Sequence, residues 1–330
     1  MTKIYAAVGS APGIFALNGA APNELTGYNK TLSIFHVIQL GLPTQFGIVV
    51  TAWNEKISKC VLHFLESSTW EQVLIRTDKK DETGKYMRGG YLVSRTEVIP
   101  EVLSILAKGR IVLLLEPANK YTNLYGINTL IKIGTDDALL EIVGPGFDVS
   151  DINRGDISPH ERIQLCVQDG ELTGRVLNRV TIDQTKYKET VALRLEKIGK
   201  GLLSKRGDNL DHWTPSQLQS IAEKHLRSTG FTLLLDSRNS YRPFPKPYLQ
   251  DLVSLARDIP WKISATTKEI ECVIACSVVG TWDDYHFIFW DIVYPTKKYN
   301  VSNLSEPRLE HIGNRRHGIV ASALKRTLGD

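Results

Sequence analysis

Residues 27–51 read Gly-Tyr-Asn-Lys-Thr-Leu-Ser-Ile-Phe-His-Val-Ile-Gln-Leu-Gly-Leu-Pro-Thr-Gln-Phe-Gly-Ile-Val-Val-Thr, and this segment is the most informative in the chain about its fold. Apolar residues recur at helical spacing between Leu32 and Ile38, and Pro43 blocks any continuation of such a helix. Much of the same run alternates between apolar and polar positions, so periodicity alone leaves a strand open. Residues 47–51 form a β-branched run of the kind that is buried on both faces in a mixed α/β sheet.

Lys30 stands at the start of the segment if it is a helix. The first backbone N–H groups of a helix have no partner within it, and together with an ammonium group they favour an anion such as phosphate. A solvated surface lysine is the alternative interpretation. Lys30 is therefore the first candidate for a phosphate contact.

Arg76 is the second candidate, because it follows the apolar run Val73-Leu74-Ile75 at the end of an expected strand. A planar guanidinium grips phosphate oxygens in a bidentate manner, which an ammonium group does not. An arginine held in a salt bridge at the end of a strand is the alternative.

The order of these segments resembles the ATP-binding domain of pyruvate phosphate dikinase, phosphoenolpyruvate synthase and related dikinases, which has an ATP-grasp fold. That family opens with a Gly-x-Lys-Gly-Ala-Asn-Leu helix, followed by Gly-Leu-Pro and a strand ending in Thr; Lys30, Gly41 and Thr51 occupy those places, and Thr31 replaces a glycine. Its strand ending in Val-Arg-Ser-Ser matches Arg76. The resemblance implies a helix after Lys30 and an α/β (α+β) class, with an ATP-grasp-like, two-lobed fold and mixed sheets. It also implies catalytic and ATP-binding roles for Lys30 and Arg76.

Further nucleotide contacts follow from the same resemblance. The apolar strand Ile111–Leu115 stops at Glu116 and Pro117, which matches the hinge between the lobes where adenine binds. Acids flank a Gly-Pro-Gly turn after the next strands, as in the family's Glu-x-x-x-Gly-x-Gly-Glu. This match makes Glu141 and Asp148 cofactor-binding candidates, although glycines are equally common in ordinary turns.

The expected metal site lies near the end of the chain. The segment Glu269–Cys272 resembles the family's Asp-Ile-Glu-Trp, which makes Glu271 a Mg²⁺ ligand, and Asp291 is the nearest acid on the next expected strand. Mg²⁺ takes one or two carboxylates together with phosphate oxygens. The family's Gln-x-Arg is replaced by Ile292 and Tyr294, and losing that arginine puts catalysis in more doubt than binding.

The expected organisation is an N-terminal ATP-grasp lobe over residues 1–109, a hinge and the start of a second lobe over 110–160, a helical insert over 161–260, closing strands over 261–298 and a basic tail over 299–330. Within the insert, Pro215–Arg227 is predicted to be an amphipathic helix with Thr214 as its N-cap. The chain contains no Gly-Gly-x-x-Ser-His segment, so the phosphohistidine domain that dikinases carry is absent from it.

Composition favours a cytoplasmic protein. The 330 residues are 42% hydrophobic, no apolar run is long enough to span a bilayer, and the N-terminus lacks the pattern of a secretory signal. The net charge is +4, with basic residues gathered between Arg308 and Arg326 in a tail that would dock a protein partner or, alternatively, nucleic acid.

Three functions remain open on sequence grounds. The first is an enzyme that binds ATP and Mg²⁺ and, as a kinase-like transferase or ligase, phosphorylates or activates an unidentified acceptor. The second is a nucleotide-binding regulatory or assembly subunit without turnover. The third is a nucleic-acid or protein interaction module that acts through its basic tail.

Overall fold

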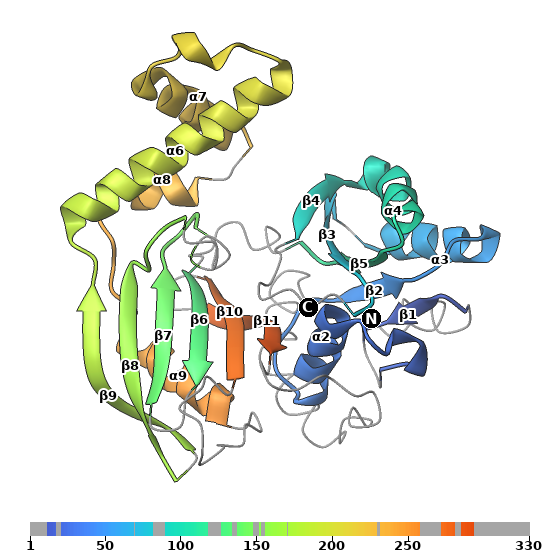
Figure 1. Ribbon diagram of the computed structural model, residues 1–330, viewed down its shortest axis with the longest axis horizontal. Coiled ribbons are helices and arrows are strands. Elements are labelled where there is room, and N and C mark those ends of the chain that lie inside the picture. The colour runs from blue at the N-terminus through green and yellow to red at the C-terminus, as the bar shows by residue number, and fades with distance from the viewer. Residues whose placement is uncertain are drawn as a thin grey trace, which may run out of the picture.

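Two antiparallel sheets with helices packed on them make up the fold (Figure 1). The computed structural model describes residues 12–17, 21–68, 70–81, 90–117, 127–133, 137–147, 152, 156–169, 171–229, 232–257, 272–280 and 285–293. Asp148, Glu271 and the basic tail lie outside these residues. The α+β character expected from the sequence is confirmed.

The first sheet has five strands in the order β1-β2-β5-β3-β4. They are β1 (Ile14–Ala16), β2 (Gly47–Val50), β5 (Ile111–Leu115), β3 (Gln72–Asp78) and β4 (Tyr91–Ser94). All four residues of β2 are buried, as predicted. The expectation of mixed sheets is wrong, because every pairing between described strands is antiparallel. Burial of β2 on both faces arises instead from helices that cover both faces of an antiparallel sheet.

Helices cover the two faces of this sheet. Helix α2 (Asn29–Gln39) packs on one face, and α3 (Glu55–Glu66) and α4 (Val98–Ala107) pack on the other. The apolar residues of α2 are buried, which confirms the predicted helix and excludes the strand. Asn54 is the N-cap of helix α3, and its side chain accepts a hydrogen bond from the Ile57 amide at 2.9 Å. Two short 3₁₀ turns, η1 (Asn23–Leu25) and η2 (Arg95–Glu97), precede α2 and α4.

The second sheet has six strands in the order β11-β10-β6-β7-β8-β9. They are β11 (Tyr285–Val293), β10 (Cys272–Gly280), β6 (Ile127–Ile133), β7 (Asp137–Val143), β8 (Glu161–Gln168) and β9 (Glu171–Thr181). Helix α9 (Lys246–Arg257) packs on one face and shares a core with the sheet. The chain passes from the first sheet to the second between β5 and β6. The region 161–260 likewise begins with two strands of this sheet.

A group of helices lies beyond one end of the second sheet (Figure 1). It consists of α6 (Gln184–Arg206), the 3₁₀ turn η4 (Leu210–His212), α7 (Pro215–Ser228) and α8 (Leu233–Ser237). The predicted helix after Thr214 is confirmed, and Thr214 forms a capping box with Gln217. Among the described helices, none is long and apolar enough to cross a membrane.

Candidate functional site

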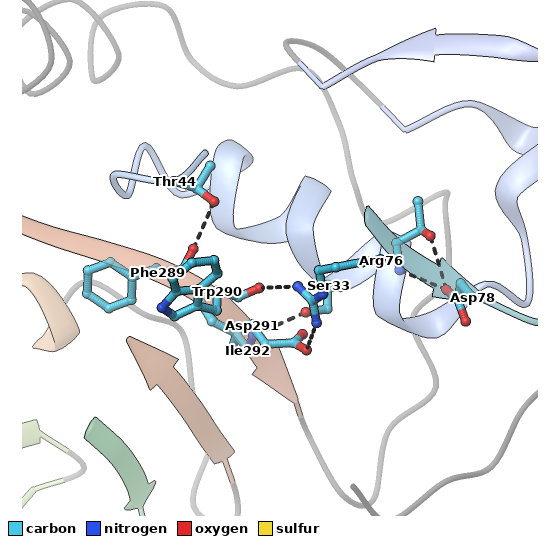
Figure 2. A network of polar contacts seen from close by, with 9 residues as sticks. Ser33, Thr44, Arg76, Asp78, Phe289, Trp290, Asp291 and Ile292 are labelled. Atoms are coloured by element: carbon cyan, nitrogen blue, oxygen red, sulfur yellow. Dashed lines mark hydrogen bonds and ion pairs between the residues drawn. The ribbon is translucent and has the colours of Figure 1, made fainter. Parts of the chain in front are cut away.

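Arg76 connects the two sheets. It lies on β3 together with Leu74 and Asp78, and residues two apart on a strand project to the same face, here the face covered by α2. Its guanidinium donates to the Asp291 carboxylate at 3.2 Å and to the Trp290 carbonyl at 3.1 Å, both on β11 (Figure 2). The Arg76 side chain is 8% exposed and that of Asp291 is 1% exposed. This ion pair is therefore a buried contact between segments more than 200 residues apart in the sequence.

The side chain of Asp78, at the end of β3, bonds to the first turn of α2. Its carboxylate accepts a hydrogen bond from the Thr31 amide at 2.9 Å and another from the Thr31 hydroxyl at 3.1 Å (Figure 2). The other carboxylate oxygen accepts from the Lys79 amide at 2.8 Å. The anion at the helix N-terminus is thus a carboxylate of the chain itself, where the sequence had suggested phosphate. The physical reason is the one given for phosphate, since unpaired amides attract any negative charge.

Lys30 precedes Thr31 in α2, is partly exposed and acts on the Asp78 carboxylate through its charge. Burial raises the pKa of Asp78, and the bonds from Thr31 and the charge of Lys30 oppose that rise. Lys30 also acts on Asp291 through its charge. The structure therefore brings Lys30, Arg76, Asp78 and Asp291 into one group, which we call the junction cluster.

A bulge in β11 shapes the cluster. The pairing with β10 joins Cys276 to Phe289 and Ala275 to Asp291, so Trp290 is the extra residue. A bulge of this kind re-aims side chains and removes backbone groups from the ladder. The indole N–H of Trp290 donates to the hydroxyl of Ser277 on β10.

Backbone groups of β11 on either side of the bulge bond to the first half of the chain. The Phe289 amide donates to the Pro43 carbonyl at 2.7 Å, and its carbonyl accepts from the Thr44 hydroxyl at 2.8 Å. The Ile292 amide donates to the Ser33 hydroxyl of α2 at 3.2 Å (Figure 2). These bonds hold β11 against α2 and thereby fix Asp291 opposite Arg76.

Asp291 is the most perturbed acid of the cluster. Burial raises its pKa to about 6, Arg76 and Lys30 act against the rise, and the neighbouring charge of Asp78 adds to it. Its Oδ2 bonds to Arg76, whereas Oδ1 is buried without a hydrogen-bond partner in the described part of the chain. A buried carboxylate oxygen without a donor is unfavourable, and it marks a place for a cation or a proton.

Glu116 lies apart from the cluster. It follows β5, and the pairing of β5 with β3 puts Leu113 opposite Arg76. Three residues of extended chain separate Leu113 from Glu116, or about 10 Å. Glu116 is buried, its amide donates to the Phe46 carbonyl at 2.8 Å, and its carbonyl accepts from the Gln45 side chain.

Glu141 also lies apart, on the second sheet. Across the sheet, Glu141 of β7 pairs with Leu130 of β6, Leu130 pairs with Ala275 of β10, and Ala275 pairs with Asp291 of β11. In-register positions share a face of the sheet, and three strand spacings amount to about 14 Å, so the two acids cannot hold one ion between them. Glu141 is buried and pairs with Arg162 at 3.4 Å. No group of three or more histidine, cysteine, aspartate or glutamate residues suited to a metal occurs in the described ranges.

The predicted glycine turn after Glu141 packs on the helices. The Gly144 amide donates to Nδ1 of His160 at 2.9 Å, and burial lowers the pKa of His160 to about 4. The His160 ring meets the rings of Phe147, Tyr187 and Tyr241 edge-on, at centroid distances of 4.6, 5.0 and 5.7 Å. This turn is therefore tied to the helical region by a neutral histidine.

Sequence reasoning had not selected Asp78, Thr31, Ser33 or Trp290. Asp78 was detectable, because its spacing of two from Arg76 on an expected strand puts both side chains on one face. The roles of Ser33 and Trp290 depend on a long-range contact and a bulge that no local pattern indicates. No family model, no curated protein and no solved structure matches this chain.

Proposed function

We propose that this chain is an ATP-grasp-like enzyme that binds ATP with Mg²⁺ at the junction cluster and transfers phosphate to, or activates, an acceptor that its residues do not identify. One observation carries the proposal. Lys30, Arg76 and Asp291 were selected from three segments as two phosphate contacts and a metal ligand; Arg76 and Asp291 form an ion pair where the two sheets join, and the charge of Lys30 acts on Asp291.

Each residue has a chemical role in this proposal. Lys30 is partly exposed and offers an ammonium group to phosphate oxygens entering from solvent. Arg76 holds Asp291 in place and adds positive charge beside the phosphates. The Oδ1 atom of Asp291, which accepts no hydrogen bond from the described residues, suits Mg²⁺. Mg²⁺ binds to a single carboxylate when phosphate oxygens and water complete its coordination shell. When bound, Mg²⁺ would neutralise phosphate charge, and the chain's residues would mainly position the nucleotide.

A nucleotide-binding subunit without turnover is the second candidate function. Two observations favour it. The Asp78 carboxylate already accepts from the first turn of α2, and the Arg76 guanidinium donates to two groups of the protein, the Asp291 carboxylate and the Trp290 carbonyl. Such a cluster retains Lys30 as an anchor for a nucleotide but has fewer groups ready to stabilise a transition state.

The test is a calorimetric titration of ATP with Mg²⁺ into the wild type and Lys30→Ala, with release of ADP and AMP followed in parallel. Because Lys30 is partly exposed, the variant is expected to remain folded and to bind ATP at least tenfold more weakly. Lys59→Ala is the matched control, since Lys59 is exposed and pairs with Glu55 on the surface of α3. Equal affinity of Lys30→Ala and Lys59→Ala for ATP would show that Lys30 does not contribute to ATP binding.

A second pair of variants tests Arg76. Removing it leaves Asp291 buried and unpaired, so binding must be read beside thermal unfolding. Arg179 makes a comparable clamp, donating to the buried carboxylate of Glu161 and to the Phe244 carbonyl. Loss of ATP binding in Arg76→Gln but not in an equally destabilised Arg179→Gln would support the site.

The released product distinguishes the candidate functions. ADP release by the wild type indicates a kinase or acyl-phosphate ligase, AMP release indicates dikinase-like or adenylating chemistry, and binding without release favours the second candidate. Failure of the wild type to bind ATP would refute both candidates.

A further inference from the structure

Helix α6 carries an excess of positive charge. Its 23 residues include seven basic residues (Lys186, Lys188, Arg194, Lys197, Lys200, Lys205 and Arg206) and two acidic ones (Glu189 and Glu196), a net charge of +5. The whole chain has a net charge of only +4. The positive charge of the protein is therefore not spread evenly, and α6 concentrates it in one helix.

Most of these charges face solvent and are not neutralised. Lys186, Lys188, Lys197, Lys200, Lys205 and Arg206 are exposed, and we call them the α6 basic surface. Lys197 pairs with Asp156 at 3.0 Å, and the Lys197 side chain is still 61% exposed. Within the described residues, Lys188, Lys200, Lys205 and Arg206 form no ion pair.

The stability of the helix does not account for this distribution. Lys205 and Arg206 lie in the last turn, where cations stabilise the helix dipole. Lys186 lies in the first turn, where the carboxylate of the N-cap Asp183 accepts from its amide and offsets its charge. Lys188 lies just beyond the first turn, at the end where positive charge is unfavourable. Helix stability therefore does not explain Lys188, Lys197 or Lys200.

The composition of the surface indicates the kind of partner. From Lys186 to Arg206 the helix rises about 30 Å, and among the large apolar residues of α6 only Leu193, at 64%, is strongly exposed. A stable protein interface needs an apolar centre and is depleted in lysine, so α6 is poorly suited to an acidic protein. A phosphodiester chain needs accessible cations and no apolar centre, because binding is driven by release of its counterions. At 3.6 residues per turn, Lys186, Lys197 and Lys200 share the side of α6 opposite its buried residues, and Lys188, Lys205 and Arg206 lie toward its two ends.

We propose that the α6 basic surface binds the phosphate backbone of a nucleic acid. The surface lies on the helical region beyond the second sheet (Figure 1), whereas the junction cluster lies between the two sheets. The proposal therefore stands independently of nucleotide binding, and a failure of one leaves the other unaffected.

The experiment measures binding of fluorescently labelled 20-nucleotide RNA and DNA, single- and double-stranded, by anisotropy at 50, 100 and 200 mM NaCl. The test variant is Lys186→Gln/Lys188→Gln/Lys200→Gln/Lys205→Gln. The control variant is Lys56→Gln/Lys59→Gln/Lys108→Gln/Lys246→Gln, which removes the same charge from exposed lysines outside α6. Circular dichroism and thermal unfolding establish that both variants are folded.

We expect the wild type and the control variant to bind with micromolar affinity at 50 mM NaCl, and the α6 variant to bind at least tenfold more weakly. For a single strand, each phosphate contact contributes about 0.7 to the slope of log K against log salt, so four lost contacts lower it by about 2.8. Equal losses in the two variants would show a general charge effect and overturn the proposal, as would unchanged binding by the α6 variant. Binding to phosphatidylserine vesicles but not to any oligonucleotide would also overturn it, in favour of a membrane surface.

Discussion

Acidification is expected to destabilise this chain through one buried side chain, His160. The ring is fully buried, and burial lowers its pKa from 6.5 to about 4. Below pH 6.5 the unfolded chain binds a proton that the folded chain does not, so stability present at neutral pH is lost as the pH falls. A difference of about 2.5 pKa units corresponds to about 3 kcal/mol by pH 4, at 1.36 kcal/mol per unit.

The variant His160→Asn isolates this effect. An asparagine oxygen can replace Nδ1 as the acceptor for the Gly144 amide, but it does not titrate. At pH 7 the variant should be less stable by about 1–3 kcal/mol, because it loses contacts with the three aromatic rings around His160. As the pH falls to 4 this deficit should shrink by about 3 kcal/mol, since only the wild type continues to lose stability at this position.

The assay is urea unfolding, followed by circular dichroism, of both proteins at pH 7, 6, 5 and 4. All other titrating groups are common to the two proteins and cancel in the difference. A stability difference that stays constant from pH 7 to pH 4 would show that His160 titrates alike in the folded and unfolded chain, which would contradict this prediction.

Three further outcomes follow from the structure. Asp291→Asn should reveal a pH dependence of opposite sign, because burial raises the pKa of Asp291 to about 6. The protonated side chain then contributes to the free energy of unfolding below pH 3.8, and this contribution is lost as the pH rises through 6. In urea unfolding, the stability of the wild type relative to the variant should therefore increase as the pH falls from 7 to 4. Asp78→Ala should lower the free energy of unfolding by about 1–3 kcal/mol, because it leaves a buried amide at the start of α2 without an acceptor; a loss below 0.5 kcal/mol at pH 7 would contradict that role. Gly199→Ala should destabilise the protein by several kcal/mol in thermal unfolding, since its added carbon would lie 2.2 Å from the Leu218 carbonyl oxygen of α7, whereas Gly201→Ala, with nothing within 4 Å, should stabilise α6 by up to about 1 kcal/mol. Similar effects at the two glycines would contradict the close packing of α6 on α7.

The local elements were largely predictable because their signals are local. Helix α2, strand β2 and helix α7 with its Thr214 cap occur where apolar spacing, a proline and a capping residue indicated. The direction of the strands was not predictable in this way. Burial of β2 suggested a mixed sheet, but an apolar strand reads the same whether its neighbours are parallel or antiparallel.

The candidate site was predictable in part. Lys30, Arg76 and Asp291 were selected from the sequence and belong to one cluster, whereas Glu116 and Glu141 were selected and lie apart from it. The difference depends on register, because a shift along or across a sheet moves a side chain by many ångströms without changing the sequence pattern around it.

Local sequence patterns were sufficient to predict helix α2, strand β2 and helix α7, but not strands β8 and β9, which lie in a region expected to be helical. The packing of distant segments brings the carboxylate of Asp78 to the first turn of α2 and the guanidinium of Arg76 to Asp291, on a strand far along the chain. Secondary structure follows from neighbours within a few residues. The partner of a buried charge follows instead from how distant segments pack, since a charge removed from water bonds to the nearest opposite charge that the fold provides.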